Sequence, residues 1–276
     1  MTYDKIYNLD EIAYRYQVVL FDIWGVLIDA RVLNEGAVDR INRIIAQKDV
    51  RFVTNAPRLA ATTAQRLRDA GFCVQDHHVI TSGDILRRYI RDYKGTIYHL
   101  GSDRNTEILA GLKLYLTKKI EEADLLLLTL SRYGHEDLTG VLNFLKYAAK
   151  LNIKAVCPNP DHELHLADRM KYCAGYFAAY YTKLGGHVLY IGKPEYNIFQ
   201  EVFFEFASVP KSNFLIVGDT LHTDIQGAYN TGIDSALVLT GNMHQAIKGI
   251  PDWGFASAVE SACQKYGVYP TYLVQI

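Results

Sequence analysis

The sequence predicts an α/β protein built around parallel β-strands. Three observations lead to this fold class: apolar runs of strand length recur, they lack in/out alternation, and stretches of helical period separate them. Such runs suit parallel strands buried on both faces, with the intervening helices as crossovers. The expected strands are QVVLFD, VRFVTN, TIYHLG, DLLLLTL, IKAVCPN, HVLYIG, NFLIVGD and SALVLTG.

One helix can be placed directly after VRFVTN. Pro57 suits a first helical turn, the apolar side chains up to Leu67 share one face, and Gly71 suits the end of the helix. Later in the chain, Gly185 and Gly186 form a candidate hinge. No low-complexity linker or internal repeat marks a domain boundary.

Length and charge limit the classes of partner. The 276 residues are 49% hydrophobic and 21% charged, which suits one or two globular domains. The formal net charge of −1 provides no overall basic field for nucleic acid or an anionic membrane, so we expect neither as a partner. Small solutes are the favoured partners.

The sequence also predicts a cytoplasmic protein. Charged residues are scattered through the first stretch, MTYDKIYNLDEIAYRYQ, and no later segment approaches the roughly 20 apolar residues that span a bilayer. The four cysteines, Cys73, Cys157, Cys173 and Cys263, lie far apart without a C-x-x-C pair, which predicts reduced, mostly buried thiols. The histidines in DHH and DHELH lack the further ligand spacing of a zinc site.

Polar residues of one chemical theme follow four of the expected strands. They are Asp22, the pair Thr54 and Asn55, Lys193, and the two acids Asp219 and Asp224. Ligands of open parallel sheets gather outside the carboxyl ends of the strands, so these residues are candidates for one site. Their chemistry is that of phosphoryl transfer.

Each residue type has a role in that reaction. Asp22 and Asp219 would bind Mg²⁺, which neutralises the charge of a phosphoryl group, and Asp22 would then attack phosphorus to form an aspartyl-phosphate. Thr54, Asn55 and Lys193 would bind the equatorial oxygens. Asp224 would hold metal-bound water or orient Lys193. Taken singly, each residue has an ordinary structural explanation as a turn or cap residue.

These motifs resemble those of the haloacid dehalogenase (HAD) superfamily. The matching residues are D-x-W-G-V from Asp22, Thr54-Asn55, Gly192-Lys193-Pro194, and G-D-x4-D-I from Gly218. The stretches VCPNPD, YCAGYFAAYYTKLGG and SALVLTGN are similar to the class IIA branch, the NagD and nitrophenyl-phosphatase-like hydrolases, and in particular to its subgroup with an Asp-x-Trp-Gly first motif.

The resemblance implies a Rossmann-like core and an inserted α/β cap domain. The core would comprise residues 1–82 and 187–276, and the cap residues 83–186. It implies Mg²⁺-dependent hydrolysis of small phosphorylated metabolites, with the backbone carbonyl of Trp24 as a further metal ligand. By analogy with the family's NPD segment, Asn159, Asp161 and His162 would face the substrate; a proline-fixed turn is the alternative. A homodimer is left open beside a monomer.

Trp24 departs from the family pattern. Most phosphatases of the superfamily have a second Asp there, which protonates the leaving oxygen and then activates water. General acid/base help is typically worth ~10²–10⁴-fold in rate, so we expect a slow enzyme or one that prefers good leaving groups. Replacement candidates are Asp29, Asp161, His162 and His165. Trp24 itself would pack in the fold or stack on a substrate ring.

Two other hypotheses remain. Trp24 motivates a catalytically retired, phospho-ligand binding or regulatory protein on the same scaffold. A dinucleotide-dependent oxidoreductase would suit the α/β pattern, but no G-x-G-x-x-G follows an expected strand. A Mg²⁺-dependent phosphatase acting through Asp22 is the leading hypothesis.

Overall fold

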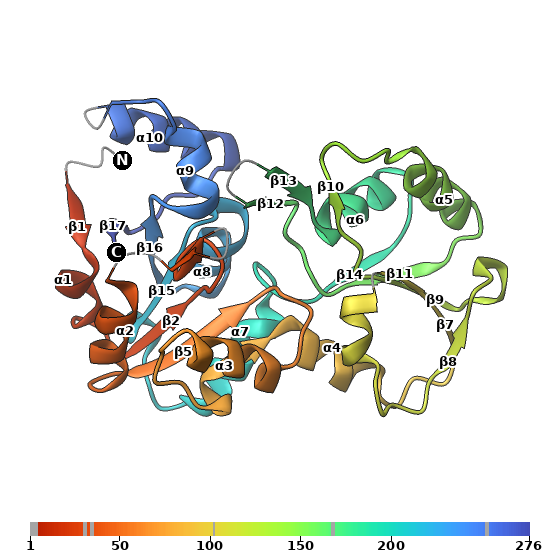
Figure 1. Cartoon of the computed structure of the whole chain (residues 1–276), viewed down its shortest axis with the longest axis horizontal. Coiled ribbons are helices and arrows are strands. Elements are labelled where there is room, and N and C mark those ends of the chain that lie inside the picture. Colours follow the sequence, from red (N-terminus) through yellow and green to blue (C-terminus); the bar gives the residue numbers. More distant parts are fainter. Residues whose placement is uncertain (1–4, 30–31, 34–35, 102, 167–168, 252–253) are drawn as a thin grey trace. The chain divides into compact units, whose positions relative to one another are not determined.

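The computed structural model of the chain divides into two compact units. It describes residues 5–29, 32–33, 36–101, 103–166, 169–251 and 254–276. Unit 1 comprises Met1–Thr54, Ala61–Ile80 and Lys193–Ile276, and unit 2 comprises Asn55–Ala60 and Thr81–Gly192. Both contain parallel sheets with helices, so the predicted α/β fold is confirmed (Figure 1).

Unit 1 contains a seven-stranded sheet of order β1-β17-β16-β15-β2-β5-β6. Its strands are β1 (Ile6–Asn8), β2 (Val18–Phe21), β5 (Asp49–Thr54), β6 (Val79–Thr81), β15 (Phe214–Gly218), β16 (Asp234–Val238) and β17 (Tyr272–Gln275). Its helices are α1 (Leu9–Ala13), α2 (Ala37–Ile45), α3 (Ala60–Asp69), α7 (Tyr196–Glu205), α8 (Gln226–Thr231), α9 (Gly241–Ile247) and α10 (Phe255–Tyr266). A short antiparallel pair, β3 (Ile28–Asp29) and β4 (Val32–Leu33), follows β2.

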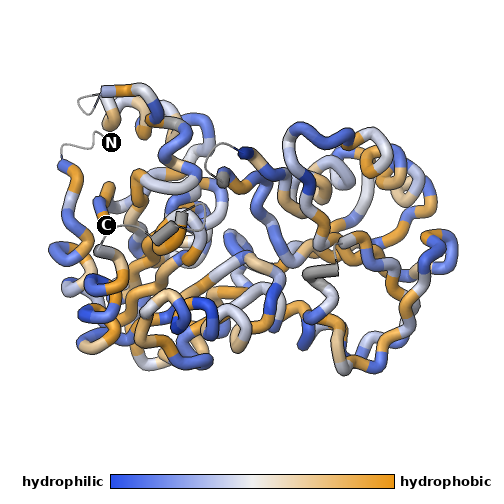
Figure 2. The backbone as a smooth tube through the Cα atoms, in the orientation of Figure 1, coloured by the Kyte–Doolittle hydropathy of each residue, from blue (hydrophilic) through white to orange (hydrophobic). Residues whose placement is uncertain are grey.

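The centre of this sheet determines where polar side chains can gather. All four residues of β2 are buried, and β2 pairs in parallel with β15 on one side and β5 on the other. Phe21 lies opposite Val217 and Phe52, so the three strands end at the same edge of the sheet. The central strands are correspondingly hydrophobic (Figure 2).

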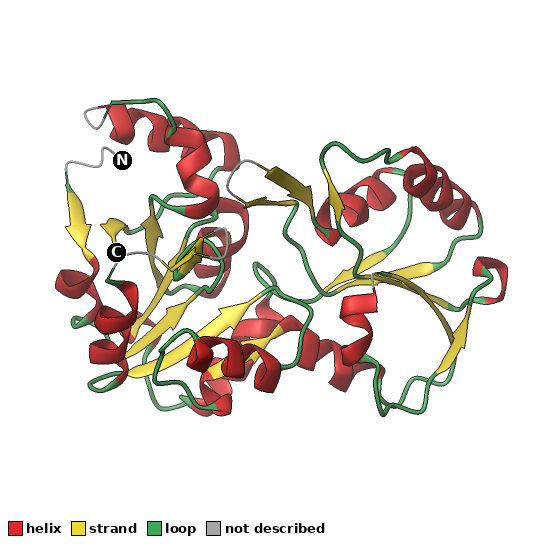
Figure 3. Cartoon of the chain, viewed as in Figure 1, coloured by secondary structure: helices red, strands yellow, loops and turns green. Residues whose placement is uncertain are grey.

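Unit 2 contains a five-stranded sheet of order β14-β11-β9-β7-β8, in which every neighbouring pair is parallel. The strands are β7 (Thr96–Leu100), β8 (Tyr115–Thr117), β9 (Leu125–Leu128), β11 (Lys154–Cys157) and β14 (Val188–Tyr190). A small antiparallel sheet is formed by β10 (Arg132–Tyr133), β12 (Glu163–Leu166) and β13 (Arg169–Tyr172). The helices are α4 (Ser82–Ile90), α5 (Thr139–Lys150) and α6 (Ala174–Lys183) (Figure 3).

The leucines of β9 explain why this sheet is buried on both faces. Leu126 and Leu128 pack in a cluster with residues of α5 and α6, whereas Leu125 and Leu127 pack in a second cluster with residues of α4. Successive side chains of a strand point to opposite faces, so an unbroken apolar run requires cover on both sides. All eight predicted runs form strands of the two parallel sheets.

The predicted helix after β5 begins later than expected. Helix α3 starts at Ala60, so the interpretation of Pro57 as a residue of its first turn was wrong. The carbonyl of Arg58 accepts a hydrogen bond from the Thr81 hydroxyl at 2.7 Å, and the Asp84 carboxylate accepts one from the Ala60 N–H at 2.8 Å. These contacts anchor the loop before the helix and cap the helix where it begins.

Gly185 and Gly186 end helix α6 within unit 2, and the chain passes to unit 1 between Gly192 and Lys193. Gly186 lies against the ring of Tyr181, where an added Cβ would come within 2.2 Å of the ring. Among the described residues, no helix is both long and apolar enough to cross a bilayer.

Replacement of Thr81 by valine should destabilise unit 2. Thr81 is fully buried, and its hydroxyl also caps α4 by accepting from the Asp84 N–H at 3.1 Å. Thr81→Val preserves the side-chain shape but removes the hydrogen bonds to the Arg58 carbonyl and from the Asp84 N–H, which should lower the free energy of unfolding by about 1–3 kcal/mol. Urea unfolding measures the loss. Thr81→Ser keeps the hydroxyl and serves as the control; equal stability of both variants would contradict the role given to the hydroxyl.

Candidate active site

The carboxyl edge of the unit 1 sheet brings three acids together. Asp22 follows β2, Asp219 follows β15, and Asp224 lies on the π-helical turn Leu221–Ile225 before α8. The Asp22 N–H donates to the Val217 carbonyl at 2.9 Å, which ties the end of β2 to β15. Side-chain oxygens of the three acids lie within 4.8 Å of one another, and all three residues are buried.

The acids form a site with an excess of negative charge. Burial and the nearby carboxylates of Asp22 and Asp224 raise the pKa of Asp219 well above its ordinary value, although hydrogen bonds to its oxygens oppose the shift. Clustered buried carboxylates repel one another unless a cation is present. Oxygen ligands in this arrangement fit a hard divalent cation.

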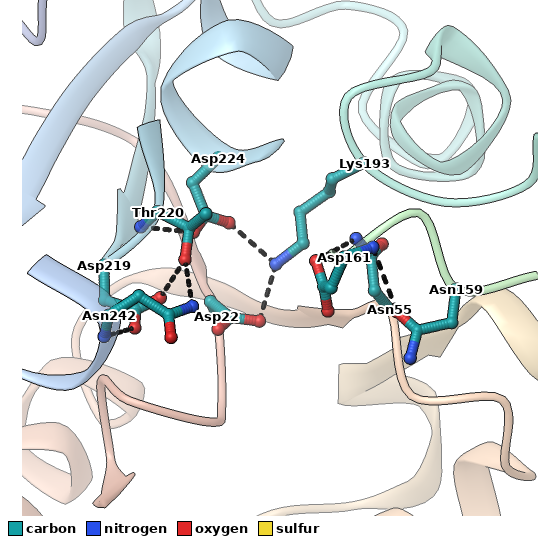
Figure 4. A network of polar contacts seen from close by, with 9 residues as sticks. All are labelled: Asp22, Asn55, Asn159, Asp161, Lys193, Asp219, Thr220, Asp224 and Asn242. Carbon is teal, nitrogen blue, oxygen red and sulfur yellow. Dashed lines mark hydrogen bonds and ion pairs between the residues drawn. The ribbon is translucent and has the colours of Figure 1, made fainter. Parts of the chain in front are cut away.

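Lys193 provides one positive charge inside this cluster. Its Nζ lies 2.5 Å from Oδ1 of Asp22 and 2.7 Å from Oδ1 of Asp224 (Figure 4). Burial lowers the pKa of Lys193, but the two carboxylates outweigh this effect and raise it overall, so the amine is protonated. Three carboxylates and one ammonium leave a formal charge of −2, which a divalent cation would neutralise.

Glycines allow the backbone to approach these acids closely. An added Cβ at Gly25 or at Gly241 would lie 2.1 Å from Oδ2 of Asp219, and both residues have a positive φ, +88° and +54°. An added Cβ at Gly218 would lie 2.1 Å from the carboxyl carbon of Asp224. Only glycine therefore fits at these three positions beside the acid cluster.

Two further expected residues lie in the same unit. Thr54 is the last residue of β5 and is buried. Trp24 is partly buried and lies in the turn after Asp22, where it forms a bridge with Ile28 and the Gly25 N–H donates to the Ile28 carbonyl at 2.9 Å. This turn fixes the backbone on either side of the Trp24 peptide.

The expected substrate loop lies in unit 2, together with Asn55. Nδ2 of Asn55 donates to Oδ1 of Asp161 at 2.9 Å, and Oδ1 of Asn159 accepts from the Asp161 N–H at 3.2 Å. His162 is exposed, and Nε2 of His165 lies 3.3 Å from Oε1 of Glu163. The side chain of Asp29 lies outside the described residues.

Two hydrogen-bonding residues of the site were missed in the sequence. Thr220 and Asn242 both contact Asp219: the Thr220 hydroxyl donates to Oδ1 at 2.8 Å, and the Asn242 N–H donates to Oδ2 at 2.6 Å. Asn242 lies in the SALVLTGN stretch, whose polar end after an apolar strand was the available signal.

Comparison with known proteins identifies the family. A family model described as haloacid dehalogenase-like hydrolase matches residues 19–114, and a second, HAD-hydrolase-like model matches residues 190–261. The chain belongs to the haloacid dehalogenase-like hydrolases. These matches confirm the predicted superfamily, and the similar proteins named below confirm the predicted enzyme class, a hydrolase of the phosphatase type.

Similar proteins match 80% or more of the chain. Chronophin from Mus musculus is 28% identical over 248 residues, 84% of each chain. Dihydroxyacetone phosphatase from Corynebacterium glutamicum is 25% identical over 228 residues, 80% of each chain. The crystal structure of a possible sugar phosphatase from Cytophaga hutchinsonii has a TM-score of 0.80 and 25% identity, covering 98% of this chain and 97% of that one.

Substitution of Gly25 by alanine should inactivate the site. The added methyl group would collide with Oδ2 of Asp219, and a misplacement of about 1 Å can cost 10²-fold in rate. We expect Gly25→Ala to lose metal-dependent phosphatase activity by at least this factor in a steady-state assay.

Gly185→Ala is the matched control. Gly185 has the same φ of +88°, but an added Cβ there would meet nothing within 4 Å. Both substitutions place an alanine at the same positive φ, with a backbone strain of roughly 1–2 kcal/mol, and only one of them disturbs Asp219. Equal activities of the two variants would contradict the collision.

Proposed function

We propose that this protein is a Mg²⁺-dependent phosphatase that hydrolyses small phosphorylated metabolites through an aspartyl-phosphate on Asp22. The observation that carries the proposal is the buried cluster of Asp22, Asp219 and Asp224 with Lys193 between two of its members. The substrate class is supported by the names of relatives, a dihydroxyacetone phosphatase and a possible sugar phosphatase.

The residues present suit a magnesium ion. The donors are carboxylates, the hard oxygen ligands that Mg²⁺ prefers, and the formal charge of the cluster with Lys193 is −2. Asp22, Asp219 and Asp224 would hold the ion together with the backbone carbonyl of Trp24. When bound, Mg²⁺ supplies charge neutralisation and orients the phosphoryl group toward the nucleophile.

Asp22 is the proposed nucleophile. Oδ1 is already engaged by Lys193, so the carboxylate is held in place and its charge is partly compensated. A carboxylate oxygen of Asp22 would form the bond to phosphorus while the bond to the leaving oxygen breaks, and water would then hydrolyse the resulting acyl phosphate. The two steps return Asp22 to its starting state.

Lys193, Thr54 and Asn55 are the proposed phosphate-binding residues. The ammonium of Lys193 would stabilise the charge that spreads over the equatorial oxygens, and the Thr54 hydroxyl and the Asn55 amide would donate hydrogen bonds to them. Asp224 would orient Lys193, since their side chains are paired at 2.7 Å.

Trp24 requires another residue to act as the acid and base. We favour Asp161 among the four candidates, because its carboxylate is hydrogen-bonded within unit 2 to Asn55, the residue directly after Thr54. Asn159 and His162 of the same loop would contribute to substrate specificity, and unit 2 would act as the cap. The cytoplasmic location and the choice between monomer and homodimer remain predictions from the sequence.

A phospho-ligand binding protein on the same scaffold is the second candidate. The observation that favours it is Trp24, whose indole ring cannot transfer the proton that the usual Asp transfers. Such a protein would bind phosphate and Mg²⁺ without turnover, and a rate assay separates it from the phosphatase.

Removal of the nucleophile should abolish turnover. We expect Asp22→Asn to lower the rate of aryl phosphate hydrolysis in Mg²⁺ on the order of 10⁴-fold or more, which is the usual cost of removing a nucleophile. The assay compares the wild-type protein with the variant, each with Mg²⁺ and with EDTA. An unchanged rate in the variant would refute Asp22 as the nucleophile, and background rates in both would favour the binding protein.

The leaving group tests Asp161. Asp161→Asn should slow the hydrolysis of alkyl phosphates by ~10²–10⁴-fold, with a much smaller effect on an aryl phosphate, which departs more readily without a proton. Adding Trp24→Asp should restore the alkyl phosphate rate, because it returns an acid to the first motif. Equal losses on both substrates would contradict the role of Asp161 as an acid.

A further inference from the structure

A chain of hydrogen bonds within unit 1 connects Asn242 to Asp219 through Thr220. Nδ2 of Asn242 donates to Oγ1 of Thr220 at 2.8 Å, and the Thr220 hydroxyl donates to Oδ1 of Asp219 at 2.8 Å (Figure 4). The backbone N–H of Asn242 reaches the other oxygen, Oδ2, at 2.6 Å. Both oxygens of Asp219 are therefore engaged by donors that belong to or depend on these two residues.

The direction of each hydrogen bond follows from the number of protons available. In the ionised form that binds a cation, the Asp219 carboxylate can only accept, so the single hydroxyl proton of Thr220 must point toward it. The group of Asn242 that faces Thr220 must then be its NH₂ donor, because a carbonyl there would meet no proton. The Asn242 amide thus selects the hydroxyl orientation that serves Asp219.

The backbone of Asn242 is fixed independently of its side chain. The Thr240 hydroxyl donates to the Gly25 carbonyl at 2.6 Å, and Gly241 lies so close to Gly25 that an added Cβ would be 2.5 Å from its Cα. The 240–242 segment is therefore fastened to the turn after Asp22. A substitution that changes only the Asn242 side chain should leave the N–H bond to Asp219 in place.

The remaining oxygen of the Asn242 amide provides a second observation. Oδ1 is buried, and it has no hydrogen-bond partner among the residues that the structure describes. Buried acceptors are ordinarily satisfied by protein groups or by ordered water. The Asn242 amide is therefore held by its donor side, through Thr220, and not by its oxygen.

We propose that Asn242 is a positioning residue for Asp219 that acts through the Thr220 hydroxyl and thereby sets the affinity of the site for its divalent cation. The inference rests on the proposed metal site. Groups that orient metal ligands from the outside typically change metal affinity by 10–100-fold when they are removed. Asn242 would not touch the substrate, so its effect should appear in metal binding rather than in the chemical step.

The experiment is a double-mutant cycle read by Mg²⁺ binding in calorimetry, with Mn²⁺ as a second probe. Asn242→Leu removes the amide at nearly constant volume, and Thr220→Val removes the hydroxyl. We expect each single variant to bind Mg²⁺ about tenfold or more weakly. The double variant should bind no more weakly than Thr220→Val, because Asn242 acts through the hydroxyl, and coupled residues are not additive.

Three variants complete the design. Thr220→Ser keeps the hydroxyl but removes the methyl group, and it should retain the wild-type affinity for Mg²⁺. A role of Thr220 in packing alone would predict weaker binding by this variant. His244→Ala changes an exposed residue of the same helix and should have no effect. Asn242→Ala replaces Asn242→Leu if the latter does not fold.

The outcomes separate the two proposals. A wild-type protein that binds Mg²⁺, with Asn242 variants of equal affinity or with additive losses in the double variant, overturns the role of Asn242 and leaves the metal site intact. A wild-type protein that binds neither cation overturns the proposed metal site and this inference with it. The inference is supported if Asn242→Leu binds Mg²⁺ more weakly, Thr220→Ser retains the wild-type affinity and the losses in the double variant are non-additive.

Discussion

The site depends on the burial of three carboxylates around one ammonium. Removing a charged group from water costs several kcal/mol even after the protein relaxes, and attraction offsets this only where geometry and hydrogen bonds are good. Lys193 supplies such geometry to Asp22 and Asp224, but Asp219 has no cation among its described partners and relies on neutral donors. The charge left over defines what the site must bind, a compact divalent cation.

The clustering of the three carboxylates also restricts the backbone around them. Carboxylates can crowd together only if the surrounding loops leave room, and Gly25, Gly218 and Gly241 provide it at positions where any side chain would overlap an acid. Two of these glycines also have positive φ, a conformation in which other residues are strained. The tight turn after Asp22 and the start of α9 are thus consequences of packing around Asp219.

The features that could be predicted from the sequence are those that depend on a local pattern of residues. Unbroken apolar runs such as LLLL at Leu125 identified strands buried on both faces, and acids directly after strands identified the carboxyl edge of the sheet. The start of α3 could not be predicted, because Thr81 and Asp84 hold the residues before it, and these contacts are tertiary. The same is true of the side-chain partners of Asn242 and Asp161, which lie 22 and 106 residues away in the chain.

The chemistry proposed for this protein has two parts, and Trp24 affects only one of them. Charge neutralisation, nucleophilic attack and phosphate binding require groups that unit 1 largely contains, and Trp24 removes none of them. Proton transfer to the leaving oxygen is a separate requirement, and its weight falls as the leaving group becomes a weaker base. A chain that retains Asp22, Lys193, Asp219 and Asp224 in a paired, buried arrangement still carries the cost of burying those charges. A phospho-ligand binder would have little use for a buried nucleophile, so the pairing of Asp22 with Lys193 favours the proposed catalyst, whose substrates or second acid make the missing Asp dispensable.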